Sequence, residues 1–556
     1  MDYILHVLVM VALFAILATS FNLLIGYSGL FALSHAAFFG IGAYATAIVA
    51  LKLGLPFPMP LLMGLAVTAV AGVVVALPAL RISGDYLVIV SLALQVIVIA
   101  VMLNWTGLTG GTDGIRGIPR IQILGASLDT AAKFLPLAVI VAALCYWGSW
   151  RVGASPFGRA LKAMRENEAA AQAAGKNIVA MKLAVFAIAA ALASVAGSLY
   201  AQYVTFISAD SFTLELTIYV LAMVILGGTG NLAGSMLGAA LLVVLPELLK
   251  FVDLPPDIAD KLRQLFYGVL LIVMLRLRPQ GLLPESASAH HYLAPAVRPR
   301  VDRPIAAAAL EGRGLEKRFG GIVAVSKLDL ALAPGRITGL IGPNGAGKTT
   351  AFNLLTGFIE PDAGEVAYRG RLLKGLKPHR IVRLGIARSF QDLKLFTRLT
   401  VLENVLVALP RQRGDHLAYV YFTPWAVASE ERANLGRAMA ILEFVGLQQR
   451  AAEPAADLSY AEEKLLAVAR LLATDAEVLL FDEPLSGLAP NTLREMQPIF
   501  RRLADSGRTL AIIEHNLDVI RELCDTAVFL DEGRKLAQDT PERLMQDPVL
   551  AERYFK

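Results

Sequence analysis

Nine apolar segments in the first half of the chain constrain its fold more than any other feature. They fall at 4–25, 30–51, 60–80, 86–103, 131–150, 179–202, 213–227, 234–250 and 260–276. A helix needs about 20 apolar residues to cross the hydrocarbon core of a bilayer. The charged residues gather after about residue 278 of the 556-residue chain, although 56% of all residues are hydrophobic. The sequence therefore predicts a polytopic α-helical membrane domain, followed by a domain of another class.

The first segment resembles a signal peptide in hydrophobicity, but it lacks a basic start and a small-residue cleavage site. We therefore expect a retained helix. Glycine and proline interrupt several segments, at positions such as Gly26, Gly29 and Pro78. Such breaks are tolerated where neighbouring helices or an internal cavity satisfy the backbone, which favours a permease over a simple anchor.

A basic loop between the fifth and sixth segments indicates the orientation. It carries Arg151, Arg159, Lys162, Arg165, Lys176 and Lys182. Lys and Arg are enriched in cytoplasmic loops, so this loop should be cytoplasmic and the N-terminus should lie outside. Residues 158–175 of the loop are mostly strong helix formers and end in Gly175, which predicts a short helix on the cytoplasmic face.

Four polar side chains within the segments are candidates for function: Asn22, Gln95, Glu215 and Glu247. An ionisable residue inside a membrane is a functional candidate by default, and the alternative is an interhelical hydrogen bond or a place near the interface. The second explanation is favoured for Glu247, and both stay open for Glu215. His35 lies among small residues and is expected to serve packing.

Two glycine-rich loops, at 107–117 and 227–234, superficially resemble phosphate-binding loops. Neither ends in Lys followed by Ser or Thr, so we expect an outside or re-entrant loop and a tight cytoplasmic turn, respectively. A third loop is complete. It consists of Gly342, Pro343, Asn344, Gly345, Ala346, Gly347, Lys348, Thr349 and Thr350, after an apolar strand and before a helix.

This third loop fits the pattern G-x-x-x-x-G-K-[ST] of nucleotide-binding loops. Its backbone N–H groups and the helix N-terminus would hold phosphate oxygens. Lys348 would reach the β- and γ-phosphates, and the Thr349 hydroxyl would bind Mg²⁺. The second half is therefore expected to be an α/β P-loop domain that uses ATP and Mg²⁺.

Two carboxylates follow the apolar run 478–481 and should lie at the end of a buried strand. Asp482 can hold Mg²⁺ through water, and Glu483 can act as the general base on the attacking water. His515 follows another strand-like run and can contact the γ-phosphate. The three residues are therefore candidates for the site of ATP hydrolysis.

Several stretches resemble the branched-chain amino-acid ABC importer family, with a permease fused to an ATP-binding cassette. They are 22–30 (NLLIGYSGL), 81–87 (RISGDYL), 108–115 (LTGGTDGI), 387–391 (ARSFQ) and 514–516 (EHN). The resemblance covers nearly the whole chain. It implies a permease domain at 1–280, a linker at 281–309 and a cassette at 310–556. The helix within 158–175, with Glu168-Ala169-Ala170, resembles the coupling helix that docks importer permeases onto their ATPases.

The resemblance also implies roles for three further residues. Phe319 would stack on the adenine ring, Gln391 would touch Mg²⁺ and the attacking water, and Ser459 would belong to the signature loop that serves the partner cassette's ATP. A helical subdomain would occupy about 392–475. The signature loop departs from the family pattern, because Ala461 replaces a glycine and Glu462 replaces glutamine.

Another departure is Ala489, where cassettes usually carry Asp or Asn. The site bounded by Ala461 and Glu462 is therefore expected to be the weaker of two ATP sites. The two cysteines, Cys145 and Cys524, suggest neither a disulfide framework nor a metal site. A net charge of +5 without a basic arm gives no indication of nucleic-acid binding.

The expected function is that of an ATP-driven importer subunit for branched-chain or hydrophobic amino acids. The membrane half has few buried charges, which suits a neutral, compact cargo. An importer of urea or short amides, or a membrane ATP sensor that transports nothing, is the alternative. The resemblance implies a multi-pass protein of the bacterial inner membrane with a cytoplasmic ATPase domain. Its partners would be a second permease, a second ATPase and an extracytoplasmic binding protein.

Overall fold

The computed structural model describes residues 2–80, 84–123, 125–249, 268–269, 272–273, 276–285, 309–548 and 550. The chain forms two compact units. The first contains Met1–Arg165, Ile178–Ser286 and Val420–Phe422, and the second contains Glu166–Asn177, Ala287–Tyr419 and Thr423–Lys556. The short segment Glu166–Asn177 thus groups with the second unit, although the resemblance had assigned it to the permease domain.

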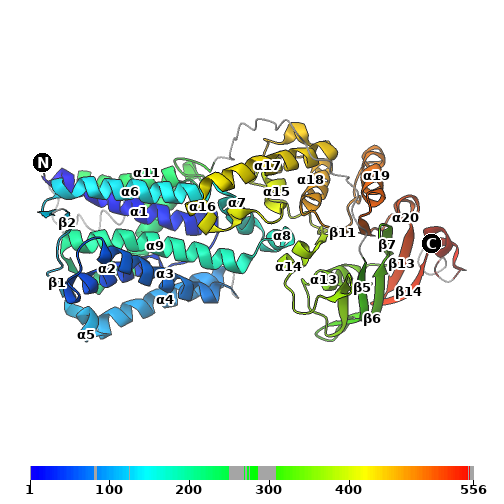
Figure 1. Cartoon of the computed structure of the whole chain (residues 1–556), viewed down its shortest axis with the longest axis horizontal. Coiled ribbons are helices and arrows are strands. Elements are labelled where there is room, and N and C mark those ends of the chain that lie inside the picture. The colour runs from blue at the N-terminus through cyan, green and yellow to red at the C-terminus, as the bar shows by residue number, and fades with distance from the viewer. Residues whose placement is uncertain are drawn as a thin grey trace. The chain divides into compact units, whose positions relative to one another are not determined.

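The first unit is a bundle of long helices (Figure 1). They are α1 (Asp2–Asn22), continued by the π-helical turn η1 (Leu23–Tyr27), α2 (His35–Lys52), α3 (Met59–Ala79), α4 (Asp85–Asn104), α6 (Ala131–Gly153), α9 (Ile178–Val204), α10 (Leu214–Gly227) and α11 (Leu232–Leu249). Helix α9 packs against α2 and α3, and α1 packs against α6 and α11. The amphipathic helix α7 (Pro156–Glu166) follows α6.

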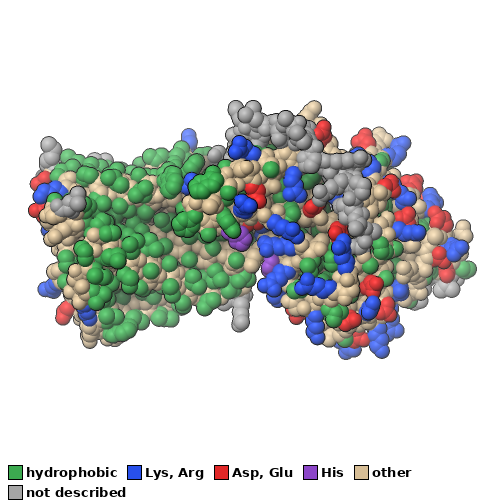
Figure 2. Space-filling view, in the orientation of Figure 1, with side chains coloured by type: hydrophobic (Ala, Val, Ile, Leu, Met, Phe, Trp, Pro, Cys, Tyr) green, Lys and Arg blue, Asp and Glu red, His purple; other side chains and the backbone are tan. Residues whose placement is uncertain are grey.

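Seven helices of the described residues are long and apolar enough to cross a membrane, and α11 is a shorter apolar helix. They correspond to eight of the nine predicted segments. The ninth, at 260–276, lies almost entirely outside the described residues. Hydrophobic side chains cover the face of this unit in Figure 2, and Val70 and Ile89 are 65% and 62% exposed. Such a surface suits lipid rather than water.

The buried polar residues of this unit serve mainly to join helices. Asn22 Nδ2 donates to Asn231 O at 2.9 Å and to Ser235 Oγ at 2.6 Å, and Asn22 Oδ1 accepts from Gly230 N at 2.8 Å. Gln95 Oε1 accepts from the N-terminus of α2, at Ala37 N. These bonds favour the interhelical explanation for both residues.

Two other polar residues occupy different surroundings. Glu215 is exposed in the first turn of α10. His35 stacks on Phe21 with ring centroids 4.3 Å apart and is hydrogen-bonded to Ser20 Oγ at 2.8 Å. The packing role expected of His35 agrees with these contacts.

The two glycine-rich loops lie at opposite ends of this bundle (Figure 1). The first forms α5 (Thr106–Thr109), η2 (Gly111–Asp113) and β1 (Ile115–Arg116), and β1 pairs with β4 (Phe206–Ile207). The second loop is the turn between α10 and α11, and a tight turn was expected there.

Two small elements complete this unit. A hairpin of β2 (Gln122–Ile123) and β3 (Ala126–Ser127) follows β1, and the turn η3 (Ala209–Phe212) precedes α10.

The second unit contains two sheets. The antiparallel sheet has the order β6-β5-β8-β9, from β5 (Leu310–Phe319), β6 (Ile322–Leu332), β8 (Ala363–Tyr368) and β9 (Arg371–Leu372). The larger sheet has the order β10-β11-β12-β7-β13-β14, from β7 (Ile337–Ile341), β10 (Ile386–Arg388), β11 (Val478–Asp482), β12 (Thr509–Ile513), β13 (Thr526–Asp531) and β14 (Arg534–Asp539). Its first five strands are parallel and only β14 is antiparallel.

Helices complete the second unit: α8 (Glu168–Ala173), α13 (Lys348–Leu355), α14 (Pro378–Leu384), α15 (Val401–Ala408), α17 (Pro424–Phe444), α18 (Tyr460–Ala473), α19 (Pro490–Asp505), α20 (Leu517–Leu523) and α21 (Pro541–Gln546). Helix α16 (Leu417–Phe422) is divided between the units, because 417–419 group with the second unit and 420–422 with the first. Helices α15, α17 and α18 pack on one another and occupy the range of the predicted helical subdomain. The core between the sheets holds Phe352, Leu340 and Val528.

Candidate active site

The phosphate-loop sequence forms the predicted strand–loop–helix. Every residue of β7 is buried, and β7 lies between β12 and β13 in the sheet. Gly342 has φ 146° and Gly347 has φ 90°. A Cβ at Gly342 would lie 2.0 Å from Leu530 O, and one at Gly347 would lie 2.4 Å from Ala324 O. Only glycine fits these positions, because both the backbone conformation and the neighbouring carbonyls exclude a side chain.

Lys348 begins α13 and its side chain folds back over the loop. Its Nζ donates to Gly342 O at 2.7 Å and to Pro343 O at 2.9 Å. Burial lowers the pKa of Lys348, whereas the nearby carboxylates of Glu483 and Asp482 raise it. The ammonium group of Lys348 therefore contacts backbone carbonyls of the phosphate loop, close to where phosphate oxygens would bind.

Strand β11 places Asp482 at its buried end. Asp482 is 2% exposed, and its Oδ2 lies 3.4 Å from Arg388 Nη2. Its Oδ1 accepts no hydrogen bond from the part of the chain that the structure describes. Burial raises the pKa of Asp482, and Arg388 and the Thr349 hydroxyl lower it in part. Thr349, the first exposed hydroxyl of α13, therefore lies close to this carboxylate.

Three predicted catalytic residues meet beside the carboxyl end of β11. Glu483 Oε1 lies 2.9 Å from His515 Nε2 and accepts a hydrogen bond from Gln391 Nε2 at 3.2 Å. Lys464 Nζ donates to the backbone carbonyl of Glu483 at 2.7 Å. Glu483 has φ 51°, a conformation that a residue with a side chain adopts only where its surroundings enforce it.

Arg388 is a site residue that the sequence analysis did not single out. Its buried guanidinium lies 4.8 Å from the ring of Phe390, and it donates to Ser389 O at 3.0 Å. Burial lowers the pKa of Arg388 to about 10, while Asp482 raises it. The neighbouring Ser389 Oγ accepts from Asp482 N at 2.9 Å, which holds the backbone that carries this carboxylate. The stretch 387–391 carried the resemblance, but its pattern does not reveal that Arg388 is buried.

Ser459 lies on a different element from the phosphate loop. It caps α18 in a capping box with Glu462, whose Oε2 accepts from Ser459 N at 2.9 Å and from Ser459 Oγ at 2.8 Å. Glu462 Oε1 also pairs with Arg450 Nε at 3.0 Å. The unusual negative charge in the signature loop is thus compensated locally. Tyr460 Oη donates to Ser486 O at 3.3 Å, which joins this loop to the one that carries Ala489.

Phe319 lies at the end of β5, paired with Ile322, and 47% of its surface is exposed. The hairpin that it belongs to approaches the phosphate loop, because Ala324 of β6 faces Gly347. Lys317 Nζ lies 5.9 Å from the centroid of its ring, and no described contact joins Phe319 to the phosphate loop itself.

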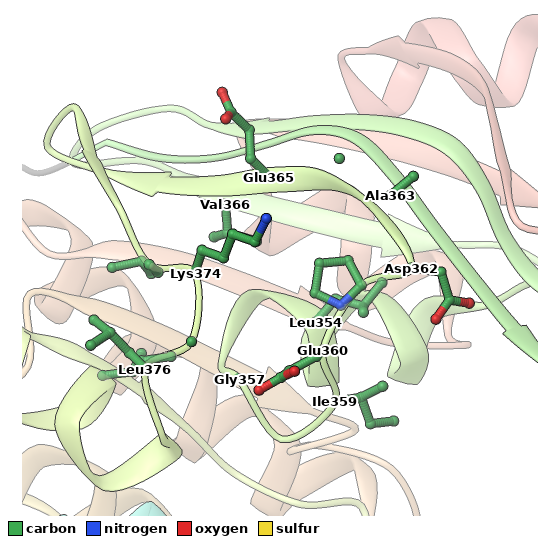
Figure 3. A pocket seen from close by; sticks show the side chains of 15 residues that line it. Leu354, Gly357, Ile359, Glu360, Asp362, Ala363, Glu365, Val366, Lys374 and Leu376 are labelled. Atoms are coloured by element: carbon green, nitrogen blue, oxygen red, sulfur yellow. The ribbon is translucent and has the colours of Figure 1, made fainter.

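Two cavities of the second unit differ in their relation to these residues. One of about 210 Å³ is lined by Gly342, Pro343 and His515, and also by Ile341, Glu514, Leu517 and Phe529. A larger one of about 310 Å³ lies between the end of α13, β8 and α14 (Figure 3). Leu354, Val366 and Lys374 line it, and no predicted site residue does. The smaller cavity therefore belongs to the candidate site.

Both halves of the chain match known protein families. Residues 3–275 match the family model "Branched-chain amino acid transport system / permease component", and residues 325–486 match "ABC transporter". The ATP-binding protein LivG of Escherichia coli K12 is 38% identical over 247 residues, which are 44% of this chain and 97% of LivG. The chain belongs to the branched-chain amino acid ABC transporter family.

This ABC transporter chain also matches the permease protein LivM of Salmonella typhimurium, with 35% identity over 298 residues, 50% of the chain and 68% of LivM. A crystal structure of a nucleotide-free ATP-binding cassette shares 29% identity, with a TM-score of 0.40, over 44% of this chain and 98% of that one. The ABC transporter chain is thus a multi-pass membrane permease fused to a nucleotide-binding ABC ATPase, and the expected family is confirmed.

Proposed function

We propose that this chain is the fused permease and ATPase subunit of an importer for branched-chain and other hydrophobic amino acids. The observation that carries the proposal is that one polypeptide matches both LivM and LivG, which are named as components of branched-chain amino acid transport. In this proposal the permease domain covers 1–280, the linker covers 281–309 and the cassette covers 310–556.

ATP would bind at the phosphate loop, with Phe319 against the adenine ring. The residues Gly342 to Thr350 supply backbone N–H groups, the α13 N-terminus and the Lys348 ammonium for the phosphates. The exposed face of Phe319 suits stacking on a base.

Mg²⁺ fits the group formed by Thr349, Asp482 and Gln391. Asp482 has a buried oxygen, Oδ1, that accepts no hydrogen bond from the described residues, and Thr349 lies near it. Mg²⁺ commonly binds through one or two carboxylates together with substrate phosphates and water. When bound, it would neutralise charge on the β- and γ-phosphates.

Glu483 would accept a proton from the attacking water. Gln391 and His515 both contact Glu483 Oε1, so they hold the carboxylate and line the path to the γ-phosphate. Arg388 and Ser389 keep Asp482 in place. Ser459 would serve the nucleotide of a second cassette, which makes hydrolysis dependent on a partner.

In this proposal the importer contains further subunits besides this chain. A second permease, a second ATPase and an extracytoplasmic binding protein that delivers the cargo would complete the importer. The ATPase would lie in the cytoplasm and the permease in the bacterial inner membrane, because the basic loop 151–182 indicates the cytoplasmic side.

The proposal is tested by ATP-dependent uptake of radiolabelled leucine into proteoliposomes that hold the chain with its partner subunits and the binding protein. Excess isoleucine or valine should compete, and lysine or glutamate should not. Leucine uptake that does not depend on ATP, or urea uptake without competition by leucine, would refute the cargo assignment.

A further inference from the structure

The first residues of the predicted linker are not a free tether. Leu282 N donates to Leu226 O and Leu283 N donates to Gly227 O, both at 2.9 Å. Asn231 Nδ2 donates to Pro284 O at 3.1 Å. Residues 281–285 therefore lie along the turn between α10 and α11. These five residues of the expected linker are thus bound to the first unit, and 286–308 lie outside the described residues.

Glu285 ends this docked strip and joins it to α7. Its Oε1 lies 2.9 Å from Lys162 Nζ, and its Oε2 lies 2.8 Å from Arg165 Nη2. The three side chains are only 16%, 13% and 12% exposed, respectively. Arg165 also donates to Gly26 O, and the Lys162 ammonium lies 5.1 Å from the ring of Tyr27. One carboxylate thus balances two cations in a mostly buried place.

The packing around this ion triad is close. A Cβ at Gly230 would lie 2.7 Å from Glu285 Cδ, and one at Gly29 would lie 2.6 Å from Arg165 Cγ. Buried charges are stable only while they are paired, and removal of one partner leaves the others uncompensated. Without the Glu285 charge, Lys162 and Arg165 would repel each other beside the turn 227–231. The contact between α7 and the α10–α11 turn therefore depends on this carboxylate.

The chain passes from the first unit to the second between Arg165 and Glu166, at the last residue of α7. Asn167 interrupts the helix and caps α8, with Oδ1 accepting from Ala170 N at 2.8 Å. Within the second unit, Glu166 accepts from Thr397 Oγ1 at 3.1 Å and from Arg398 N at 3.2 Å.

The C-terminal end of the segment 166–177 is held by an ion pair and by a hydrogen bond to a backbone carbonyl. Lys176 Nζ lies 2.7 Å from Asp415 Oδ1, with side chains 4% and 14% exposed. Arg383 Nε donates to Gly175 O at 3.1 Å. The contacts of this segment fall on α14 and on residues 397–398 and 415.

We propose that Glu285 is a positioning residue that transmits movement of the cassette into the permease by fixing α7 to the turn between α10 and α11. The inference rests on the proposed function for its transport readout. Movement of the segment 166–177 with the cassette would pull on α7, and the ion triad would carry that movement to α1, α10 and α11. The same triad would make the permease end of the linker move with α7.

The test compares Glu285→Gln with the unaltered full chain, each reconstituted with its partner subunits. Glutamine keeps the size of the side chain and removes the charge. We expect basal ATP hydrolysis to change by less than about twofold and cargo transported per ATP to fall about tenfold, a typical strength of coupling between sites. Glu311→Gln is the matched control, because Glu311 forms an exposed pair with Arg313 at the cassette end of the linker. It should leave both quantities unchanged.

A double variant with exchanged charges distinguishes a positioning role of Glu285 from a general loss of folding. The double variant Glu285→Lys with Lys162→Glu keeps the net charge of the triad, and we expect it to recover part of the transport per ATP. Cleavage at a protease site inserted within 286–308 should leave the coupling intact, because Glu285 stays with the permease. Equal transport per ATP in Glu285→Gln and the unaltered chain, or loss of coupling on cleavage alone, would overturn the inference.

Amide hydrogen exchange gives a readout that needs no cargo. Addition of a non-hydrolysable ATP analogue should alter exchange at 227–231 in the unaltered chain and not in Glu285→Gln, while exchange at 166–177 responds in both. An equal response at 227–231 in the two proteins would refute the role of Glu285. Absence of leucine uptake by the unaltered chain would instead refute the proposed cargo.

Discussion

Glu483→Gln should abolish turnover and leave nucleotide binding intact. Glutamine has the size of glutamate, so Oε1 can still accept from Gln391, which lies 3.2 Å away. The lost charge removes the base, and removal of a general base typically slows a reaction about 10²–10⁴-fold. At about 1.36 kcal/mol per tenfold, the barrier rises by about 3–5 kcal/mol.

The structural cost of this substitution is much smaller. The altered contact with His515 is partly exposed, with the two side chains 43% and 14% accessible, and such pairs contribute about 0–1 kcal/mol. The predicted loss of turnover therefore exceeds any loss of stability by several kcal/mol. The two effects can be separated by measurement.

The assay is phosphate release by the reconstituted transporter, together with binding of a fluorescent ATP analogue and a thermal unfolding curve. Glu495→Gln, an exposed glutamate on α19, is the matched control and should behave as the unaltered chain. Turnover within threefold of the unaltered chain, or loss of nucleotide binding in parallel with turnover, would refute the role of Glu483 as base.

Three further outcomes are expected. Gly347→Ala should abolish nucleotide binding, because its Cβ would lie 2.4 Å from Ala324 O; undiminished binding of a fluorescent analogue would contradict this. Glu462→Gln should keep the capping box and lose the ion pair with Arg450, so turnover should rise or stay equal, and a clear drop in phosphate release would show that the charge is needed. Asn22→Ala should lower the thermal unfolding temperature of the permease, since it removes the hydrogen bonds of Asn22 to the 228–235 segment, of about 1 kcal/mol each, and an unchanged unfolding temperature would argue against this role.

Local patterns predicted those parts of the site that form within one stretch of chain. The phosphate loop needs only neighbouring residues, so its strand–loop–helix form could be read directly. Gln391, Glu483 and His515 follow β10, β11 and β12. Glu483 and His515 were expected after a strand, whereas the role of Gln391 was implied by the resemblance alone. Their meeting depends on the order of these strands in the sheet, where β11 lies between the other two. No local pattern states that order.

Other features depend on tertiary burial and could not be predicted. Arg388 appears in the sequence as an ordinary basic residue, and only its pairing with Asp482 and its contact with Phe390 explain its burial. The strip 281–285 contains Gly and Pro and precedes a proline-rich stretch, so it resembles a linker. Its hydrogen bonds go to residues 226–227 of a distant helix, and composition carries no information about them.

The ion pair between Lys176 and Asp415 has a consequence for recognition among related transporters. Both side chains are almost fully covered, so a segment without the lysine would leave an unpaired carboxylate in a poorly hydrated place. Where permease and ATPase are separate proteins, such a pair would discriminate between the correct ATPase and that of a paralogous system. In a fused chain the covalent connection already ensures the match. The pair is then not needed to select a partner. A hybrid chain that carries the cassette of another family member would show whether the pair still discriminates between cassettes.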